Sequence, residues 1–399
     1  MRCALLGLLV LAPAVTAADW PQFRGPGGSA TSTETGLPTG FTATEGLRWK
    51  APLPGRGLSS PVVVGGRVYI TCSSGAKDDR LHVLSFDAGT GTQLWHRQLA
   101  ATGLTYCHPK TCMAAPTPVG DETGVYALYA TGDLVAFDAD GSIRWYRSLV
   151  GDYPTISNQV GMASSLVLFK DKLIVPMDNG GESFVAAIDT KTGKNVWKVN
   201  RPRNINWITP LVRTAAGKGE VLFPTNDSLI AYDVDTGNKV WTEKMPSGGI
   251  PSPTFGDDGL LLLGNRGVTA VTLKGGKPTE VWNSPKLGTG MSSPLVYEGL
   301  VYAANPAGTV VCADAKTGNV LWQERVKGPF SGSPVAADGK LYVINEAGIL
   351  TTLKLGDKPE VLAESKTGEE GLATPAISNG ALFLRGEKTL FCVGSKLGG

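Results

Sequence analysis

The chain has 399 residues, of which 42% are hydrophobic and 18% are charged, and its formal net charge at pH 7 is +2. This length can bury a large core or form two or three domains, whereas the near-neutral charge, without a run of lysine or arginine, gives no footprint for nucleic acid or an anionic membrane surface. The 52 glycines and 26 prolines make up about a fifth of the chain. Turns are therefore frequent and long helices have little room, which favours an all-β fold.

Residues 1–18 have the pattern of a secretory signal peptide. Arg2 supplies a positive charge, residues 4–11 form a short apolar run, and small residues follow at 15–18. The apolar run is too short to span a bilayer. Cys3 precedes this run, so we do not expect a lipoprotein anchor. We expect a secreted or periplasmic protein, cleaved near Ala18 and not inserted into a membrane.

Five cysteines remain after Cys3. Cys107 and Cys112 lie in one short loop, where a small disulfide can form if their Cα atoms come within about 7 Å. The other three fall in or beside predicted strands, and we interpret them as single buried thiols. They are Cys72, Cys312 and Cys392.

A tryptophan repeat dominates the sequence. Successive repeat tryptophans lie 40 to 52 residues apart. They are Trp95, Trp145, Trp197, Trp241, Trp282 and Trp322. In the next unit we place Leu362 at the matching position. Repeats of this length that contain four short strands are typical of propeller blades.

Each unit opens with Ser or Thr followed by Pro and a short apolar strand. Proline suits the first residue of a strand, where a missing N–H donor is tolerated. Only Ser165-Leu166 lacks the proline. The other starts are Ser60-Pro61, Thr117-Pro118, Thr209-Pro210, Ser252-Pro253, Ser293-Pro294, Ser333-Pro334 and Thr374-Pro375.

These marks predict an all-β, eight-bladed propeller of four-stranded antiparallel blades, formed by residues 19–399 as a single domain. The last unit has room for only three strands. We therefore expect a strand at 46–53, around Trp49, to pair with it and close the ring, which removes exposed edges. The blades are expected at roughly 58–99, 115–149, 163–200, 207–244, 250–285, 291–326, 331–366 and 372–395.

The turn before each repeat tryptophan carries a motif close to Ala-x-Asp-x-x-Thr-Gly-x-x-x-Trp, for example from Asp189 to Trp197 and from Asp314 to Trp322. Its Asp can accept backbone N–H bonds and its Gly supplies a positive φ. This spacing resembles the tryptophan-docking motif of propellers of the pyrroloquinoline-quinone (PQQ) type. The resemblance implies that the tryptophans hold neighbouring blades together, namely Trp49, Trp95, Trp145, Trp197, Trp241, Trp282 and Trp322.

The opening Asp19-Trp20-Pro21-Gln22-Phe23-Arg24-Gly25-Pro26 is similar to that of a secreted bacterial, planctomycete-type group of PQQ-binding-like repeat proteins. The size is also similar to that of BamB, the propeller subunit of the outer-membrane β-barrel assembly machinery. BamB is a lipoprotein, whereas this chain lacks the anchoring cysteine. Both resemblances imply the fold more strongly than a function.

A quinoprotein dehydrogenase would hold PQQ in the central funnel, with Ca²⁺ on Glu, Asn and Asp oxygens, an Asp base and often a vicinal disulfide. This chain has no Cys-Cys pair and no long insertion. Carboxylates and amides do recur after the second strand of the blades, as hairpin turns alone would require. They are Asp133, Asp178, Asn179, Asn226, Asp227, Asn265, Asn305, Asn345 and Glu346.

Histidine offers little for catalysis. His82 and His96 fall in predicted strands, and only His108 lies on a loop, whereas a zinc site or a Ser-His-Asp triad needs residues that converge from several loops. A cluster of His108 with Cys107 and Cys112 lacks the usual metal-ligand spacing. We expect no metal site there.

Three longer segments, residues 100–115, 151–162 and 200–207, should meet on one face around the funnel mouth. Functional residues concentrate in such loops on rigid scaffolds. We expect a non-catalytic binding or scaffold propeller of the cell envelope, without a cofactor, that presents this face to a protein or an extended ligand. The alternative is a PQQ- and Ca-dependent oxidoreductase, an alcohol or sugar dehydrogenase, with an atypical site. The binding-face candidates are Tyr106, His108, Lys110, Tyr153, Asn158, Arg201, Arg203, Asn206 and Trp207.

Overall fold

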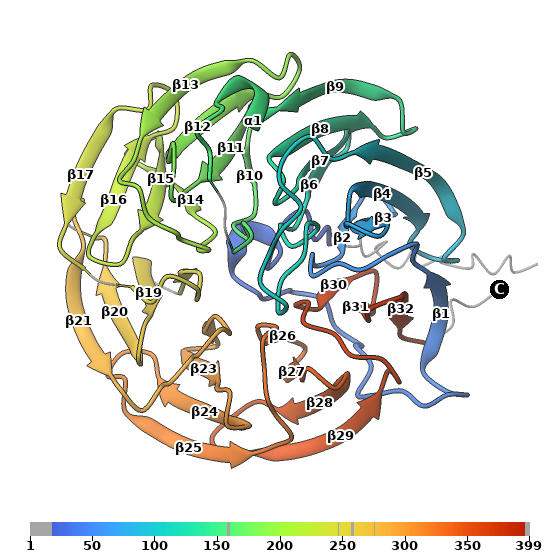
Figure 1. Cartoon of the computed structure of the whole chain (residues 1–399). Helices are drawn as coiled ribbons and strands as arrows, with labels where there is room; N and C mark the ends of the chain where they lie inside the picture. Colours follow the sequence, from blue (N-terminus) through green and yellow to red (C-terminus); the bar gives the residue numbers. More distant parts are fainter. Residues whose placement is uncertain (1–17, 158–159, 246, 257–258, 275, 396–399) are drawn as a thin grey trace, which may run out of the picture.

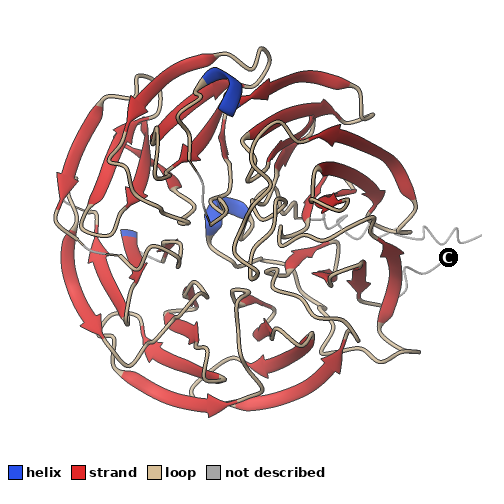
Figure 2. Cartoon of the chain, viewed as in Figure 1, coloured by secondary structure: helices blue, strands red, loops and turns tan. Residues whose placement is uncertain are grey.

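The computed structural model describes residues 18–157, 160–245, 247–256, 259–274 and 276–395. Within them, eight four-stranded antiparallel sheets surround a common axis (Figure 1), which confirms the predicted all-β, eight-bladed propeller. The helical segments include α1 (Leu149–Asp152) and the 3₁₀ turn η1 (Pro26–Gly28), drawn blue in Figure 2. The predicted signal peptide lies almost wholly outside the described residues.

Each blade runs from an inner strand at the axis to an outer strand at the rim. The first four blades comprise β2 (Val62–Val64), β3 (Arg67–Ser74), β4 (Arg80–Asp87) and β5 (Gln93–Ala100); β6 (Val119–Asp121), β7 (Gly124–Leu128), β8 (Asp133–Asp138) and β9 (Ile143–Ser148); β10 (Val167–Phe169), β11 (Lys172–Met177), β12 (Phe184–Asp189) and β13 (Asn195–Asn200); β14 (Leu211–Ala215), β15 (Lys218–Pro224), β16 (Leu229–Asp233) and β17 (Lys239–Glu243).

The next three blades follow the same order. They comprise β18 (Thr254–Phe255), β19 (Leu260–Gly264), β20 (Val268–Thr272) and β21 (Thr279–Ser284); β22 (Leu295–Tyr297), β23 (Leu300–Ala304), β24 (Thr309–Asp314) and β25 (Val320–Arg325); β26 (Val335–Ala337), β27 (Lys340–Ile344), β28 (Ile349–Lys354) and β29 (Glu360–Lys366). The last blade contains β30 (Ala376–Ser378), β31 (Ala381–Arg385) and β32 (Thr389–Val393).

The ring closes through its N-terminal strand. β1 (Leu47–Pro52) pairs antiparallel with β32 and completes the sheet β1-β32-β31-β30, with Trp49 opposite Cys392. Figure 1 shows this blue strand against the red last blade. The last blade therefore receives its fourth strand from the start of the chain, as the sequence predicts.

Outer-strand tryptophans reach the next blade. For example, Trp145 Nε1 donates to the carbonyl of Thr190 at 2.9 Å, and Asp189, one residue earlier, accepts from the backbone N–H of Thr192 at 2.8 Å. The same indole contact is made by Trp49 to Ala88, Trp95 to Ala139, Trp197 to Val234, Trp282 to Ala315 and Trp322 to Gly356. Trp241 Nε1 has no such partner among the described residues.

A glycine in each motif turn makes room for the neighbouring indole. Gly193 has φ +69°, and a Cβ built on it would lie 2.7 Å from Trp145 Cδ2. Gly318 has φ +70°, and a Cβ built on it would lie 2.6 Å from Trp282 Cδ2. The motif glycine thus meets two demands, a left-handed backbone and close contact with an aromatic ring.

The seventh blade departs from the pattern that we predicted. A bulge in the β28–β29 pair puts Ala363 opposite Thr352, the place that Trp322 takes opposite Cys312 one blade earlier, so the match with Leu362 is wrong by one residue. The small side chain of Ala363 leaves room for the N-terminal segment. A Cβ on Gly40 would lie 3.0 Å from Ala363 Cβ, and Phe41 is buried beside it.

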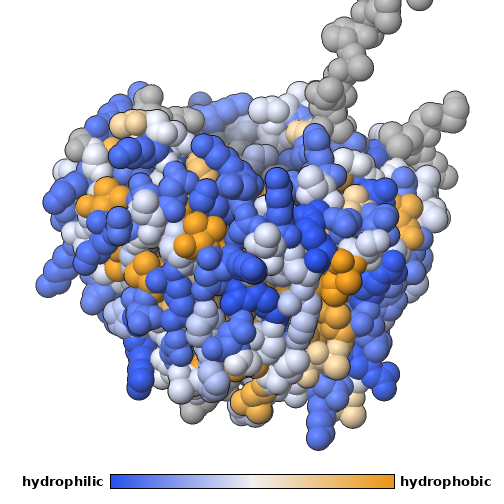
Figure 3. Space-filling view, turned by 90° about the horizontal axis from the view of Figure 1, so that it is seen from above, coloured by the Kyte–Doolittle hydropathy of each residue, from blue (hydrophilic) through white to orange (hydrophobic). Residues whose placement is uncertain are grey.

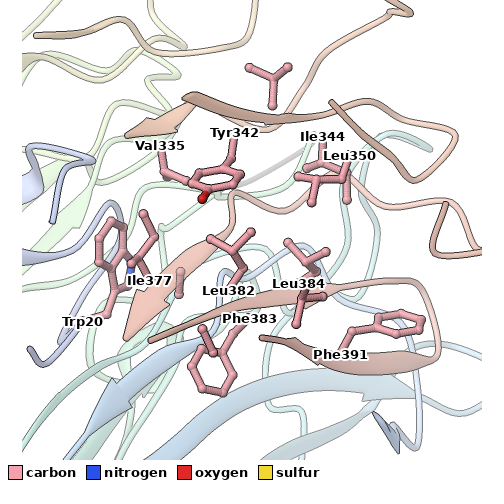
Figure 4. Close-up of a cluster of buried hydrophobic side chains, with 14 of the residues drawn as sticks. Trp20, Val335, Tyr342, Ile344, Leu350, Ile377, Leu382, Phe383, Leu384 and Phe391 are labelled. Carbon is pink, nitrogen blue, oxygen red and sulfur yellow. The ribbon is translucent and has the colours of Figure 1, made fainter. Parts of the chain in front are cut away.

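The core lies within and between the blades. Figure 4 shows aromatic and aliphatic side chains of the seventh and last blades packed together, with Trp20 of the N-terminal segment beside Ile377. The outer surface is different. In Figure 3 it is largely hydrophilic, with separate hydrophobic patches. The described residues contain no helix of the length and hydrophobicity that membrane crossing requires.

Candidate functional site

The Ser or Thr that opens each blade forms a ring of hydrogen bonds around the axis. Seven of the eight hydroxyl oxygens accept the backbone N–H of the corresponding residue in the preceding blade. The donor and acceptor pairs are Ser60 N to Thr117 (2.9 Å), Thr117 N to Ser165 (3.0 Å), Ser165 N to Thr209 (3.0 Å), Thr209 N to Ser252 (3.0 Å), Ser252 N to Ser293 (2.9 Å), Ser293 N to Ser333 (3.0 Å) and Ser333 N to Thr374 (3.0 Å). We call this set the hydroxyl ring.

The hydroxyl ring gives a physical reason for the Ser or Thr at each blade start, where the sequence had given a reason only for the proline. Ser165 keeps its place although Leu166 follows it, because the hydroxyl makes the contact between blades. The recurrence of Ser or Thr was the available signal. The ring is open at one point, since Ser60 Oγ has no partner among the described residues.

The N-terminal segment closes the axis on one side of the hydroxyl ring. Trp20 forms a bridge with Val63 of β2, and Thr31 forms one with Ala336 of β26, so the chain crosses the inner ends of the blades. η1 contacts β14 and β18 and lies near the centre of Figure 1. The opening residues 19–26, which the sequence marked only by resemblance, therefore form a floor.

A cavity of about 360 Å³ lies on the other side of this floor. Phe23 lines it together with seven of the ring hydroxyls, and its wall is mainly apolar. Its apolar wall residues include Leu58, Val160, Trp207, Ile250, Met291 and Leu372. Its shape and mixed lining are typical of a small-ligand or side-chain pocket.

The segment 100–115 folds over the mouth of this cavity. His108 and Lys110 line the cavity, and Lys110 Nζ is 3.0 Å from a carboxylate oxygen of Glu346, beyond β27 of the seventh blade. Glu346 also accepts a hydrogen bond from Ser331 at 2.7 Å. Arg56 anchors the same loop by donating to the Pro109 carbonyl at 2.6 Å.

Three predicted binding-face residues, His108, Lys110 and Trp207, are brought together at this cavity. The segments that we predicted to meet there do so. The backbone N–H of His108 donates to the Val160 carbonyl at 3.2 Å, and Trp207 Nε1 donates to the Gly161 carbonyl at 2.7 Å. Each of the three segments thus contributes to one wall.

Two other candidates are buried structural groups. Arg201 forms a bidentate pair with Asp178, at 2.7 and 2.9 Å, and its guanidinium lies 3.8 Å from the Phe223 ring centre. Asn206 donates to the same carboxylate at 3.1 Å and to the Pro224 carbonyl at 3.0 Å. Neither side chain is presented to a ligand.

The remaining candidates lie apart from the cavity or outside the described residues. Tyr153 ends α1 and packs edge-on against Phe184, with ring centres 4.8 Å apart. Tyr106 and Arg203 are exposed, and Tyr106 is 65% exposed on the segment that covers the mouth. Asn158 lies outside the described residues.

The disulfide that we considered is not formed in the structure. Cys107 and Cys112 are both free, with Cys107 Sγ 3.6 Å from the Thr111 carbonyl and Cys112 fully buried. Burial raises the pKa of Cys112 to about 12. This thiol is therefore protonated and unreactive at neutral pH.

Several of the turn carboxylates and amides bond within their own turns or to nearby loops, whereas Asp178 and Glu346 bind Arg201 and Lys110. Asn305 and Asn345 each accept the backbone N–H four residues ahead. Asp133 accepts the hydroxyls of Thr102 at 2.7 Å and Tyr146 at 2.5 Å, and burial together with this carboxylate raises the pKa of Tyr146 to about 12. These groups are used within their own blades or by the adjoining loops.

His82 and His96 form a separate cluster in the first blade. Ser74 Oγ is 2.7 Å from His82 Nε2, and His82 Nδ1 is 2.9 Å from His96 Nε2. Burial and the neighbouring His96 lower the pKa of His82 to about 4. The pair is therefore neutral at pH 7 and lies on strands rather than on converging loops.

The described lining of the cavity does not fit calcium-bound PQQ. No Asp, Glu or Asn is found among the cavity-lining residues that the structure describes, and the described chain holds no group of three His, Cys, Asp or Glu suited to a metal. Ca²⁺ needs six to eight oxygen ligands, several of them carboxylates. Hydroxyls that already accept N–H bonds are poor substitutes.

The ring of blades and the tryptophan contacts define an eight-bladed propeller of the PQQ-like repeat class. A family model described as outer membrane protein assembly factor BamB matches residues 29–175, 181–283 and 264–391. The chain belongs to this family.

Individual relatives point in two functional directions. The polyvinylalcohol dehydrogenase of Sphingopyxis sp. is 27% identical over 242 residues, which is 50% of this chain but only 35% of that enzyme. Quinohemoprotein alcohol dehydrogenase from Comamonas testosteroni superposes with a TM-score of 0.70 at 16% identity, covering 95% of this chain and 81% of the enzyme. BamB from Moraxella catarrhalis superposes with a TM-score of 0.63 at 17% identity, and the match covers 88% of this chain and 98% of BamB. These two structures share the fold.

Proposed function

We propose that this chain is a non-catalytic binding propeller of the cell envelope that holds a protein partner or another extended ligand on its loop face. The observation that carries the proposal is the cavity beneath that face, which has an apolar and hydroxyl-rich wall without carboxylates among its described residues. Such a surface can bind but has no carboxylate to take up a proton or hold a metal. The envelope location rests on the predicted signal peptide at residues 1–18.

The loop face offers contacts of the kind that dominate protein interfaces. Trp207 and Met291 line the cavity, and Met291 is 40% exposed. Leu104 and Tyr106, on the segment over the mouth, are 67% and 65% exposed. Aromatic residues and methionine are enriched at interfaces, and a central pocket suits one anchoring side chain.

The dehydrogenase alternative is supported by the similarity to polyvinylalcohol dehydrogenase and to quinohemoprotein alcohol dehydrogenase. Because the described residues of the cavity include no calcium ligand set, we expect no stoichiometric uptake when the purified protein is incubated with PQQ and Ca²⁺. Quinone absorbance after gel filtration and dye-linked oxidation of alcohols or sugars measure this. Bound quinone with turnover would refute the proposal.

The binding proposal is tested with matched surface variants. Leu104→Ala and Met291→Ala alter the loop face, whereas Leu321→Ala alters an outer strand at similar exposure, 47%. In affinity capture from envelope extracts of the source organism, followed by binding measurements with the captured partner, we expect the first two to weaken affinity about tenfold. Equal loss with all three variants would place the interface elsewhere.

A further inference from the structure

A buried arginine without a counter-ion lies in the floor of the ring. Arg24 is 1% exposed, and its guanidinium donates to the carbonyls of Pro253, at 3.1 Å, and Pro294. Among the described residues its Nε has no partner, and no carboxylate acts on its charge. Burial lowers the pKa of Arg24 to about 9. A buried charge without compensation is strongly unfavourable.

A small space adjoins Arg24. Its volume is about 10 Å³, which is room for one water-sized particle. Gln22, Arg24, Thr209 and Ser252 supply its polar lining, and Phe23 separates it from the larger cavity, which Phe23 also lines.

The polar groups around this space can donate hydrogen bonds into it. The oxygens of Thr209 and Ser252 each accept a backbone N–H of the hydroxyl ring at 3.0 Å, and their hydroxyl protons stay free to donate. Arg24 Nε is an unpartnered donor, and the Gln22 amide nitrogen can donate as well. A donor set with one net positive charge and no carboxylate suits an anion.

We propose that this space binds one small inorganic anion of the size of chloride, held by Arg24 and the donors of Gln22, Thr209 and Ser252. The bound anion neutralises the buried guanidinium and ties the N-terminal floor to the fourth, fifth and sixth blades, which Arg24 and η1 contact. This site is independent of the binding function proposed above.

The direct test compares thermal unfolding in sodium chloride and in sodium gluconate at equal ionic strength. A ligand that binds only the folded state raises the unfolding temperature in proportion to the logarithm of its concentration above Kd. We expect chloride and bromide to raise it by roughly 1 to 3 °C over gluconate. Arg24→Met should abolish this difference, whereas Arg203→Met, at an exposed arginine, should preserve it. An equal unfolding temperature in chloride and gluconate would overturn the proposal.

A second variant and a second measurement guard against misfolding of Arg24→Met. Gln22→Leu keeps the charge but removes one donor, so the half-saturating chloride concentration should increase severalfold. In crystals grown with sodium bromide, the anomalous map should show a peak within hydrogen-bond distance of Arg24 Nε. Ordered water there without an anomalous peak would show that water, not an anion, satisfies the guanidinium.

Discussion

The contact between Gly193 and Trp145 allows a quantitative test of how the blades are held together. In Gly193→Ala, the new methyl group meets the indole at 2.7 Å, whereas ordinary contacts begin near 3.4 Å. The indole must move, although its Nε1 is bonded to the Thr190 carbonyl at 2.9 Å. Overpacking of this kind costs about 1 to 3 kcal/mol, and the left-handed backbone at φ +69° adds about 1 kcal/mol. We expect a total loss of about 2 to 4 kcal/mol.

Gly339→Ala is the matched control, because Gly339 has φ +65° but no atom within 4 Å of a built Cβ. It should lose only the backbone contribution, about 1 kcal/mol. Guanidinium unfolding followed by far-UV circular dichroism measures both variants. In a Trp145→Ala background, the additional cost of Gly193→Ala should also fall to about 1 kcal/mol. If Gly193→Ala costs the same with and without Trp145, steric contact with the indole is not the reason for the glycine.

Three further predictions concern the buried polar groups. Ser252→Ala should destabilise the fold by about 1 to 3 kcal/mol, because the buried N–H of Thr209 loses its acceptor. Ser60→Ala should be nearly neutral, since Ser60 Oγ has no partner among the described residues. Chemical denaturation measures the free energy of unfolding of both variants. Asp178→Asn should lower the free energy of unfolding by about 3 to 5 kcal/mol, because it leaves the Arg201 charge buried without a partner. A smaller loss of stability than for Ser252→Ala would contradict the importance of this buried ion pair. In the folded state the pKa of His82 is lowered to about 4, so between pH 6.5 and 4 the unfolded chain binds more protons than the folded one. The contribution of His82 to stability should therefore be complete above pH 6.5 and decrease towards pH 4. Unfolding measured as a function of pH tests this.

The sequence predicted the architecture because its signals are local and repeated. The Asp, Gly and Trp of one motif lie within eleven residues, and their contacts recur from blade to blade, as at Trp145 and Trp282. The error at Leu362 has the same origin. A β-bulge shifts the register by one residue, so counting 40 residues from Trp322 identified the neighbour of Ala363.

The candidate site was only partly predictable because burial is not visible in a loop sequence. His108, Lys110 and Trp207 could be identified as loop residues near the axis, and they line the cavity. Arg201 and Asn206 have the same composition and position in the chain, yet they bind Asp178 in the interior. The difference depends on the fold of the turn that carries Asp178, because this turn places the carboxylate where Arg201 and Asn206 can both bond to it.

The hydroxyl ring and the N-terminal floor together determine what the axis can hold. The ring oxygens accept backbone N–H bonds and keep their hydroxyl protons free to donate toward the axis, while Phe23 and Arg24 fill the end that residues 19–26 cross. Donors and a buried cation favour anions or carbonyl groups and disfavour a calcium ion, whatever cofactor a propeller of this shape could otherwise enclose. Contacts between residues 40 to 57 positions apart create this preference, and the repeated Ser or Thr at each blade start is its only trace in the sequence.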